Sequence, residues 1–181
     1  MRPAGATVVR LLLTALALTG SSGAARAASE YDVKAAFLYN FAKFVDWPAS
    51  AFTTATAPLV LCVVGSDPFG PALGTIDGKL IAGHSLRIQY IAARDDLGDC
   101  HIAFIGVPDT IGRRQLLERL DSRPVLTVAD TPGFAAQGGM INFVVADGRV
   151  QFAVNPAAAT RAGLTLRAYL LKVAIIVSGQ G

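Results

Sequence analysis

The stretch Tyr31–Trp47, YDVKAAFLYNFAKFVDW, decides the fold. Its apolar residues recur at the spacing of a helix, about 100° per residue. The side chains expected on one buried face are Val33, Phe37, Phe41 and Phe44. Apolar residues extend well beyond that face, whereas a surface helix needs a stripe of only about 100°. We therefore expect the helix to be either enclosed by the core or shared between the core and a partner.

The additional apolar arc lies beside Lys34 and carries Leu38 and Val45. We expect these three residues to form a surface that packs on a second copy of the chain or on a partner protein. Burial on both sides of the helix is the alternative. Asn40 lies among the aromatic residues, and a buried amide without a hydrogen bond would cost about 1–3 kcal/mol. We expect it to bond to a neighbouring backbone group; recognition of a partner or ligand is the alternative.

Residues 1–27 have the pattern of a secretory signal peptide, with a positively charged start, an apolar run and an A-x-A cleavage site at Ala25–Ala27. The apolar run is shorter than the roughly 20 residues that span a bilayer. A retained N-terminal anchor is the alternative. We expect residues 28–181 to form a single domain that is exported.

Charge argues against nucleic acid as a partner. The chain has 16 Lys and Arg against 13 Asp and Glu, a net charge of +3. Arg2, Arg10 and Arg26 lie in the expected leader, which contains no acidic residue, so the remaining charges balance. No basic run interleaved with aromatic residues is left to follow a phosphate backbone.

Six apolar runs are predicted to be strands. They are residues 59–64, 86–91, 100–105, 124–129, 140–145 and 149–154. Helices are expected at 113–120, from Pro156 onward, and at 165–177. Continuous apolar runs are typical of strands in sheets that helices cover, and Asp147-Gly148 predicts a hairpin turn. The expected fold class is α/β, a mostly parallel or mixed sheet of about six strands with helices on both faces and an antiparallel hairpin near the C-terminal end.

The two cysteines are Cys62, in the first predicted strand, and Cys100, at the start of the third. In an exported protein we expect them to form a disulfide; two buried thiols are the alternative. The first and third strands are expected to be neighbours, which would bring the cysteines within reach. Closing a loop of about 40 residues contributes roughly 4 kcal/mol in the chain-entropy estimate.

Two loops follow predicted strands at the edge where open α/β sheets bind ligands. The first carries Asp67 and Phe69, and the second carries Gly133 and Phe134. We expect that these four residues can form a ligand cleft. The alternative is that they serve only the backbone geometry of turns.

The sequence contains no Gly-x-Gly-x-x-Gly motif, no phosphate-binding loop motif and no Gly-x-Ser-x-Gly motif. Neither His84 nor His101 has a His, Cys or carboxylate at metal-binding spacing. We therefore expect no catalytic residues, no cofactor and no metal, and the protein is not expected to be an enzyme.

Several stretches, taken together, resemble the YfiR family of exported bacterial proteins. The stretches are Tyr31–Phe44 with Trp47-Pro48, Leu61–Gly65 with Asp67–Gly70, Cys100–Ile102, Pro124–Val128 with Gly133-Phe134, Gly138–Ile141, and Asn155.

This resemblance implies a periplasmic regulatory protein. Such a protein represses an inner-membrane diguanylate cyclase by binding its periplasmic sensor domain, and so controls cyclic-di-GMP and biofilm formation. The resemblance also implies sequestration by an outer-membrane lipoprotein, the ability to form a homodimer, and a structural disulfide that Cys62 and Cys100 match. A second cysteine pair found in some members is absent here. Another membrane sensor protein is the alternative partner, and a periplasmic small-molecule-binding module of unknown ligand is the alternative function.

Overall fold

The computed structural model describes residues 29–178. The helices are α1 (Glu30–Phe44), η1 (Ala49–Ala51), η2 (Gly70–Thr75), α2 (Thr110–Leu120), α3 (Pro156–Arg161) and α4 (Ala168–Lys172). The strands are β1 (Val45–Asp46), β2 (Leu59–Gly65), β3 (Leu80–Ile81), β4 (His84–Ile91), β5 (Ile102–Gly106), β6 (Leu126–Ala129), β7 (Ile141–Ala146), β8 (Arg149–Val154), β9 (Thr165–Leu166) and β10 (Ile175–Ile176). The leader predicted at residues 1–27 lies outside the described part.

Eight strands form one mixed sheet in the order β10-β8-β7-β6-β5-β2-β4-β3, while β1 pairs with β9 in a separate two-stranded sheet. Strands β2, β4, β5, β6 and β7 are parallel, β8 returns antiparallel to β7, and β10 is parallel to β8. All six predicted strands are present, and the short strands β3 and β10 extend the sheet at its two edges. The predicted α/β class and the hairpin near the C-terminal end are confirmed.

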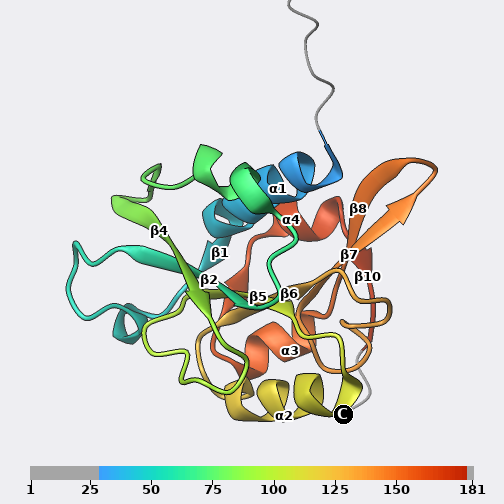
Figure 1. Ribbon diagram of the computed structural model, residues 1–181. Coiled ribbons are helices and arrows are strands. Elements are labelled where there is room, and N and C mark those ends of the chain that lie inside the picture. The colour runs from blue at the N-terminus through green and yellow to red at the C-terminus, as the bar shows by residue number, and fades with distance from the viewer. Residues whose placement is uncertain (1–28, 179–181) are drawn as a thin grey trace, which may run out of the picture.

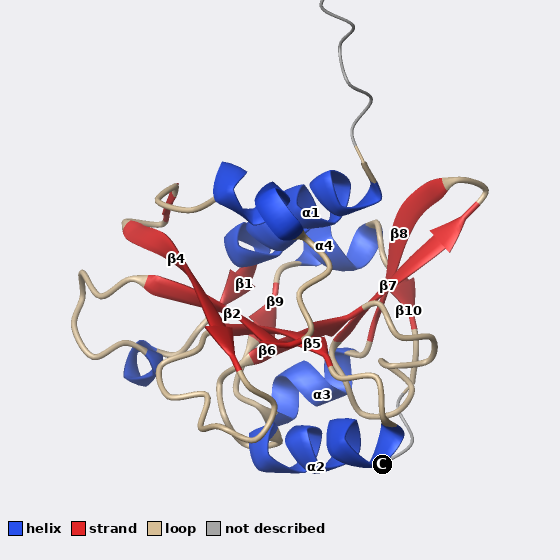
Figure 2. Ribbon diagram, viewed as in Figure 1, coloured by secondary structure: helices blue, strands red, loops and turns tan. Residues whose placement is uncertain are grey.

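Helices cover both faces of the sheet, with α1 and α4 on one side and α2 on the other (Figures 1 and 2). Strand β2, which lies between β4 and β5, is buried from Leu59 to Val64, which explains its continuous apolar sequence. Its side chains alternate between two hydrophobic clusters. One contains Leu61 and the residues of α1, and the other contains Cys62 and the inner residues of α2.

Helix α1 begins with a capping box. The Ser29 hydroxyl accepts from the backbone N–H of Asp32, and the Asp32 carboxylate accepts from the backbone N–H of Ser29 at 2.8 Å. Such reciprocal bonds satisfy amides that have no partner within the helix. The helix ends at Phe44, because Val45 is already extended and pairs with Leu166 of β9.

The prediction of one helix over residues 165–177 is wrong. This segment forms β9, the one-and-a-half-turn helix α4, and β10 in succession. Ile175 and Ile176 extend beside Ala153 and Val154 of β8, where β-branched side chains suit a strand. The apolar pattern of the segment therefore reflects an edge strand and a short helix in place of one amphipathic helix. Among the helices of residues 29–178, none combines the length and apolar character needed to cross a bilayer.

Candidate functional site

The structure corrects the expected partner surface on the first helix. Lys34, Leu38 and Val45 expose only 2%, 0% and 3% of their surface, so they lie in the core. Phe37 and Phe44, expected at the centre of the buried face, are only partly buried. The face that α1 presents to the sheet is therefore rotated toward Leu38, and these three residues do not form an exposed surface.

Small residues explain why the helix turns this face inward. Ala35 and Ala42 are buried on either side of Leu38 and allow the helix to approach the sheet closely. The bulkier rings flank the contact. The ring of Phe37 packs edge-on against Phe152 of β8, with ring centroids 5.5 Å apart.

The buried Lys34 is held by two carboxylates and an aromatic ring. Its Nζ lies 2.6 Å from Glu30 Oε1 and 2.8 Å from Asp130 Oδ2, and 4.4 Å from the centre of the Tyr31 ring. The Tyr31 hydroxyl donates to the same Asp130 oxygen at 3.0 Å. These contacts join the first turn of α1 to the end of β6, and they make a buried ammonium group tolerable.

The network also shifts the titration of its members. Burial lowers the pKa of Lys34, but the hydrogen bonds to Asp130 and Glu30 outweigh it, so that the net pKa is raised. Burial, followed by the hydrogen bond to Asp130, raises the pKa of Tyr31. Lys34 is therefore a charged structural residue that fixes the first turn of α1 against the end of β6.

In the first predicted ligand loop, the side chains stabilise the turn and the core. Asp67 Oδ1 accepts from the backbone N–H of Phe69 at 2.8 Å. The Phe69 ring is 3% exposed and packs edge-on against Phe104, with ring centroids 4.7 Å apart. The aromatic ring of this loop therefore belongs to the same hydrophobic cluster as α1.

The second predicted ligand loop buries its aromatic ring on the opposite side of the sheet. Phe134 is fully buried in the cluster that contains α2. A Cβ atom on Gly139 would lie 2.2 Å from its ring, so this position has room only for glycine. Gly133 is exposed with φ of 76°. The rings of Phe69 and Phe134 therefore lie in different clusters and do not line a common cleft.

The carboxyl ends of β2 and β5 form a small crevice at this edge of the sheet. It holds about 210 Å³ and is bordered by Ser66, Pro108, Asp130 and Thr131, among other residues. The backbone N–H of Ser66 donates to the Gly106 carbonyl at 3.0 Å and closes the gap between the strands. None of the four predicted loop residues borders this crevice.

A larger groove lies between α1 and α4. It holds about 440 Å³, and we call it the aromatic groove. Its lining residues are Phe37, Asn40, Phe41, Phe44, Phe152, Tyr169, Leu170 and Val173. The rings of Phe44 and Tyr169 lie 4.9 Å apart and connect the two helices. Asn40 is exposed at this groove, which corrects the expectation of a buried amide.

The apolar surface continues from the groove onto the edge of the sheet. Tyr169 is 62% exposed, Val173 60%, Ile175 46% and Ile176 53%. Ile176 pairs with Val154, whose side chain belongs to the hydrophobic cluster of α1, so Ile176 lies on the groove side of the sheet and Ile175 points to the other side. We call the aromatic groove together with Ile176 the docking face. Contiguous apolar side chains on a surface are typical of interaction sites, whereas isolated ones are common everywhere.

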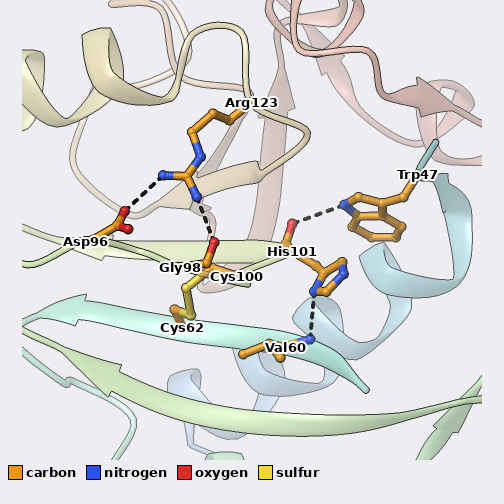
Figure 3. The surroundings of a disulfide bond; sticks show 8 residues. All are labelled: Trp47, Val60, Cys62, Asp96, Gly98, Cys100, His101 and Arg123. Atoms are coloured by element: carbon orange, nitrogen blue, oxygen red, sulfur yellow. Dashed lines mark hydrogen bonds and ion pairs between the residues drawn. A yellow bond between two sulfur atoms is a disulfide. The ribbon is translucent and has the colours of Figure 1, made fainter. Parts of the chain in front are cut away.

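The predicted disulfide is confirmed. Cys62 of β2 and Cys100, just before β5, are bonded with their Cα atoms 5.9 Å apart. Arg123 supports the loop that leads to Cys100, because it donates to Asp96 at 3.2 Å and to the Gly98 carbonyl at 2.7 Å (Figure 3). The predicted pairing of the first and third strands places the cysteines together, since Cys62 lies opposite Ala103 in the parallel pair of β2 and β5.

The sequence contained a signal for part of the docking face. The run Val173–Val177 is rich in β-branched residues, which favour a strand over a helix. The partnership of this segment with α1 has no local signal, because Phe44 and Tyr169 are far apart in the chain. Among residues 29–178, no group of three or more His, Cys, Asp or Glu side chains could hold a metal ion.

Comparison with protein families gives a match over nearly all of the described chain. The family model described as YfiR/HmsC-like matches residues 31–175. The matched region runs from the first turn of α1 to the beginning of β10 and includes both cysteines. The chain therefore belongs to the YfiR/HmsC-like family.

Proposed function

We propose that this protein is a periplasmic regulator that represses an inner-membrane signalling enzyme by binding its periplasmic sensor domain. The enzyme is proposed to be a diguanylate cyclase, so that the protein controls cyclic-di-GMP and biofilm formation. Membership of the YfiR/HmsC-like family supports a regulatory role without catalysis. A disulfide in the core fits an exported protein.

The observation that carries a function by contact is the docking face. Its most exposed apolar side chains are Tyr169 of α4, Val173 directly after that helix, and Ile176 of β10 at one edge of the sheet. The adjoining groove is lined by aromatic rings, which supply large contact areas at protein interfaces. We therefore place the partner on this face.

The partner segment that fits this face is an amphipathic one. Among residues 29–178, none of those that line the groove is charged. An uncharged apolar groove favours a ligand whose apolar side enters the groove and whose polar side faces water.

Repression requires only that the regulator binds the inactive state of the enzyme more tightly than the active state. A tenfold difference in affinity corresponds to about 1.4 kcal/mol. One well-buried aromatic anchor at an interface supplies at least that much.

A pull-down from membranes with the mature protein tests the partner, and surface variants test the face. Val173→Glu and Ile176→Glu should each abolish recovery of a membrane diguanylate cyclase and raise cyclic-di-GMP in cells to the level of a deletion strain. Leu80→Glu is the matched control, because Leu80 is 69% exposed at the opposite edge of the sheet. Recovery that falls equally in all three variants, or unchanged cyclic-di-GMP in the deletion strain, would contradict the proposal.

A homodimer and an outer-membrane lipoprotein are the two other partners that family membership suggests. The molar mass measured by light scattering at increasing protein concentration tests for the homodimer. If Val173→Glu converts a dimer to a monomer and leaves the membrane pull-down intact, the docking face is the dimer interface. Recovery of a lipoprotein in place of a cyclase would assign the face to sequestration.

A further inference from the structure

Two histidines hold the segment that connects α1 and β1 to β2. One nitrogen of each ring contacts a carbonyl of this segment: His101 Nε2 lies 3.1 Å from the Ala51 oxygen, and His84 Nδ1 lies 2.6 Å from the Ala57 oxygen. The Phe52 ring lies between the two imidazoles, stacked at 4.1 Å on His84 and at 4.4 Å on His101. The segment from Pro48 to Pro58, which we call the connecting segment, is therefore held at two points by imidazole rings.

The hydrogen bonds of His101 define which ring nitrogen carries the proton. The backbone N–H of Val60 donates to His101 Nδ1 at 3.1 Å, so Nδ1 must be unprotonated (Figure 3). The remaining nitrogen, Nε2, then carries the hydrogen and donates it to the Ala51 carbonyl. The His101 ring is neutral in this arrangement.

A second proton on this ring cannot be accommodated without movement. It would place an N–H on Nδ1 directly opposite the N–H of Val60, and His101 is only 3% exposed. The backbone of His101 is itself fixed, since its N–H donates to the Val60 carbonyl at 2.9 Å and its carbonyl accepts from Trp47 Nε1 at 3.2 Å (Figure 3). The ring must therefore leave its site, and its contact with the connecting segment breaks.

Burial of the ring favours its neutral form. Burial lowers the pKa of His101, the bond to the Ala51 carbonyl and nearby Asp99 raise it, and His84 lowers it, so that the net pKa lies below the ordinary value. Neither the connecting segment nor β2 carries a free titratable side chain, since Cys62 is in the disulfide. The released state binds the proton more readily, so the closed state loses stability as the pH falls below about 6.5 and keeps it above.

We propose that His101 is an acid-sensitive clasp: its protonation releases the connecting segment, with Phe52 and the adjoining end of α1, while the sheet and the disulfide stay in place. This conformational device does not depend on which partner the protein binds. It connects acidification to α1, because the segment leads directly from β1 at the end of that helix to β2.

Hydrogen exchange of the full mature protein between pH 7.5 and 4.5, corrected for intrinsic rates, tests the clasp. A one-proton linkage predicts that protection of the connecting segment and of the Val60 amide falls by up to about tenfold per pH unit below about 6.5. Amides of β5 and β6 should keep their protection. Trp47, the only tryptophan, provides a second readout, because its indole donates to His101 and its fluorescence should change over the same pH range.

Two variants identify the responsible group. His101→Asn retains an acceptor near Nδ1 but does not titrate, so protection of the segment should become independent of pH. His84→Phe keeps a ring stacked on Phe52 and should preserve the transition. Nitrogen chemical shifts of the His101 ring in the unmodified protein provide the titration directly, even if His101→Asn does not fold.

Three results would overturn the proposal. The first is a segment whose protection is unchanged down to pH 4.5. The second is loss of protection throughout the sheet at the same pH, which would indicate global acid unfolding. The third is a transition that disappears in His84→Phe and persists in His101→Asn, which would make His84 the sensor.

Discussion

Helix α1 and the segment from Thr165 to Val177 resemble each other in pattern: both are apolar stretches interrupted by a few charged residues. Yet α1 is one continuous helix that buries a lysine, whereas the C-terminal segment divides into three short elements and exposes Tyr169, Val173 and Ile176. The difference shows that an apolar pattern leads to burial only where another part of the chain packs against it. Asp130 lies opposite Lys34, and no strand of the described chain lies beyond β10.

Leu38→Glu should have the largest effect on stability. Leu38 is fully buried on α1, and a carboxylate there would be removed from water without a partner. We expect a loss of more than about 4 kcal/mol of unfolding free energy, sufficient to prevent accumulation of folded protein. Asn40→Glu, on the exposed side of the same helix, should change stability by less than about 0.5 kcal/mol in a denaturant titration. A folded Leu38→Glu variant that fails only in association would restore the partner surface predicted from the sequence.

Lys34→Ala should be the next most damaging change. Removal of the ammonium leaves Asp130 and Glu30 facing one another without their shared cation. Breaking a buried pair costs about 3–5 kcal/mol, and we expect the lower end because both carboxylates are partly exposed. Chemical denaturation provides the measurement, with Lys43→Ala on the exposed side as control. Equal effects of the two variants would show that Lys34 contributes no more than a surface charge.

Val173→Glu should change stability by less than about 0.5 kcal/mol, because the side chain is already 60% exposed. Association with a partner should weaken at least tenfold, about 1.4 kcal/mol. The pair of measurements separates the two regions: substitution on the inner face of α1 affects folding, and substitution on the docking face affects binding. A large loss of stability in Val173→Glu would mean that this residue belongs to the core.

Arg167→Ala should have the smallest effect. Arg167 donates to Asp46 at 2.6 Å across the two-stranded sheet, but both side chains are about half exposed, and exposed pairs contribute little. Its hydrogen bonds hold the pKa of Asp46 below the ordinary value. The pKa of the Asp46 carboxyl, followed by NMR, should therefore rise in the variant, and the part of the stability that is lost as the pH falls through this pKa should disappear. An unchanged Asp46 titration would show that the pair does not persist in solution.

Local sequence predicted the framework of the fold well. The apolar, β-branched runs that end at Gly65 and Gly106 identify β2 and β5, and their parallel pairing brings Cys62 and Cys100 together. The capping box at Ser29 is a local feature as well, because it depends on residues three positions apart. These features follow from short-range spacing and from simple rules about parallel sheets.

The orientation of α1 and the position of the docking face were not predictable in the same way. Lys34 is buried because of Asp130, which is 96 positions away in the chain. Phe69 and Phe134 follow strands, but their rings turn toward opposite faces of the sheet, which spacing alone does not reveal. The segment from Thr165 to Val177 required knowledge of the strand to which it is added. The local sequence does not show which distant segments of the chain contact one another.

The close approach of β2 and β5 at their carboxyl ends has a consequence for how this fold could change. A Cβ atom on Gly106 would lie 2.1 Å from the Ser66 carbonyl oxygen, and one on Gly65 would lie 2.8 Å from the Gly106 carbonyl oxygen. At the carboxyl ends of β2 and β5 the two backbones are thus in direct contact. Substituting side chains cannot separate them; only an insertion or a shift of the strands could do so. New binding properties are therefore far more accessible to point mutation at the docking face, where side chains alone define the surface.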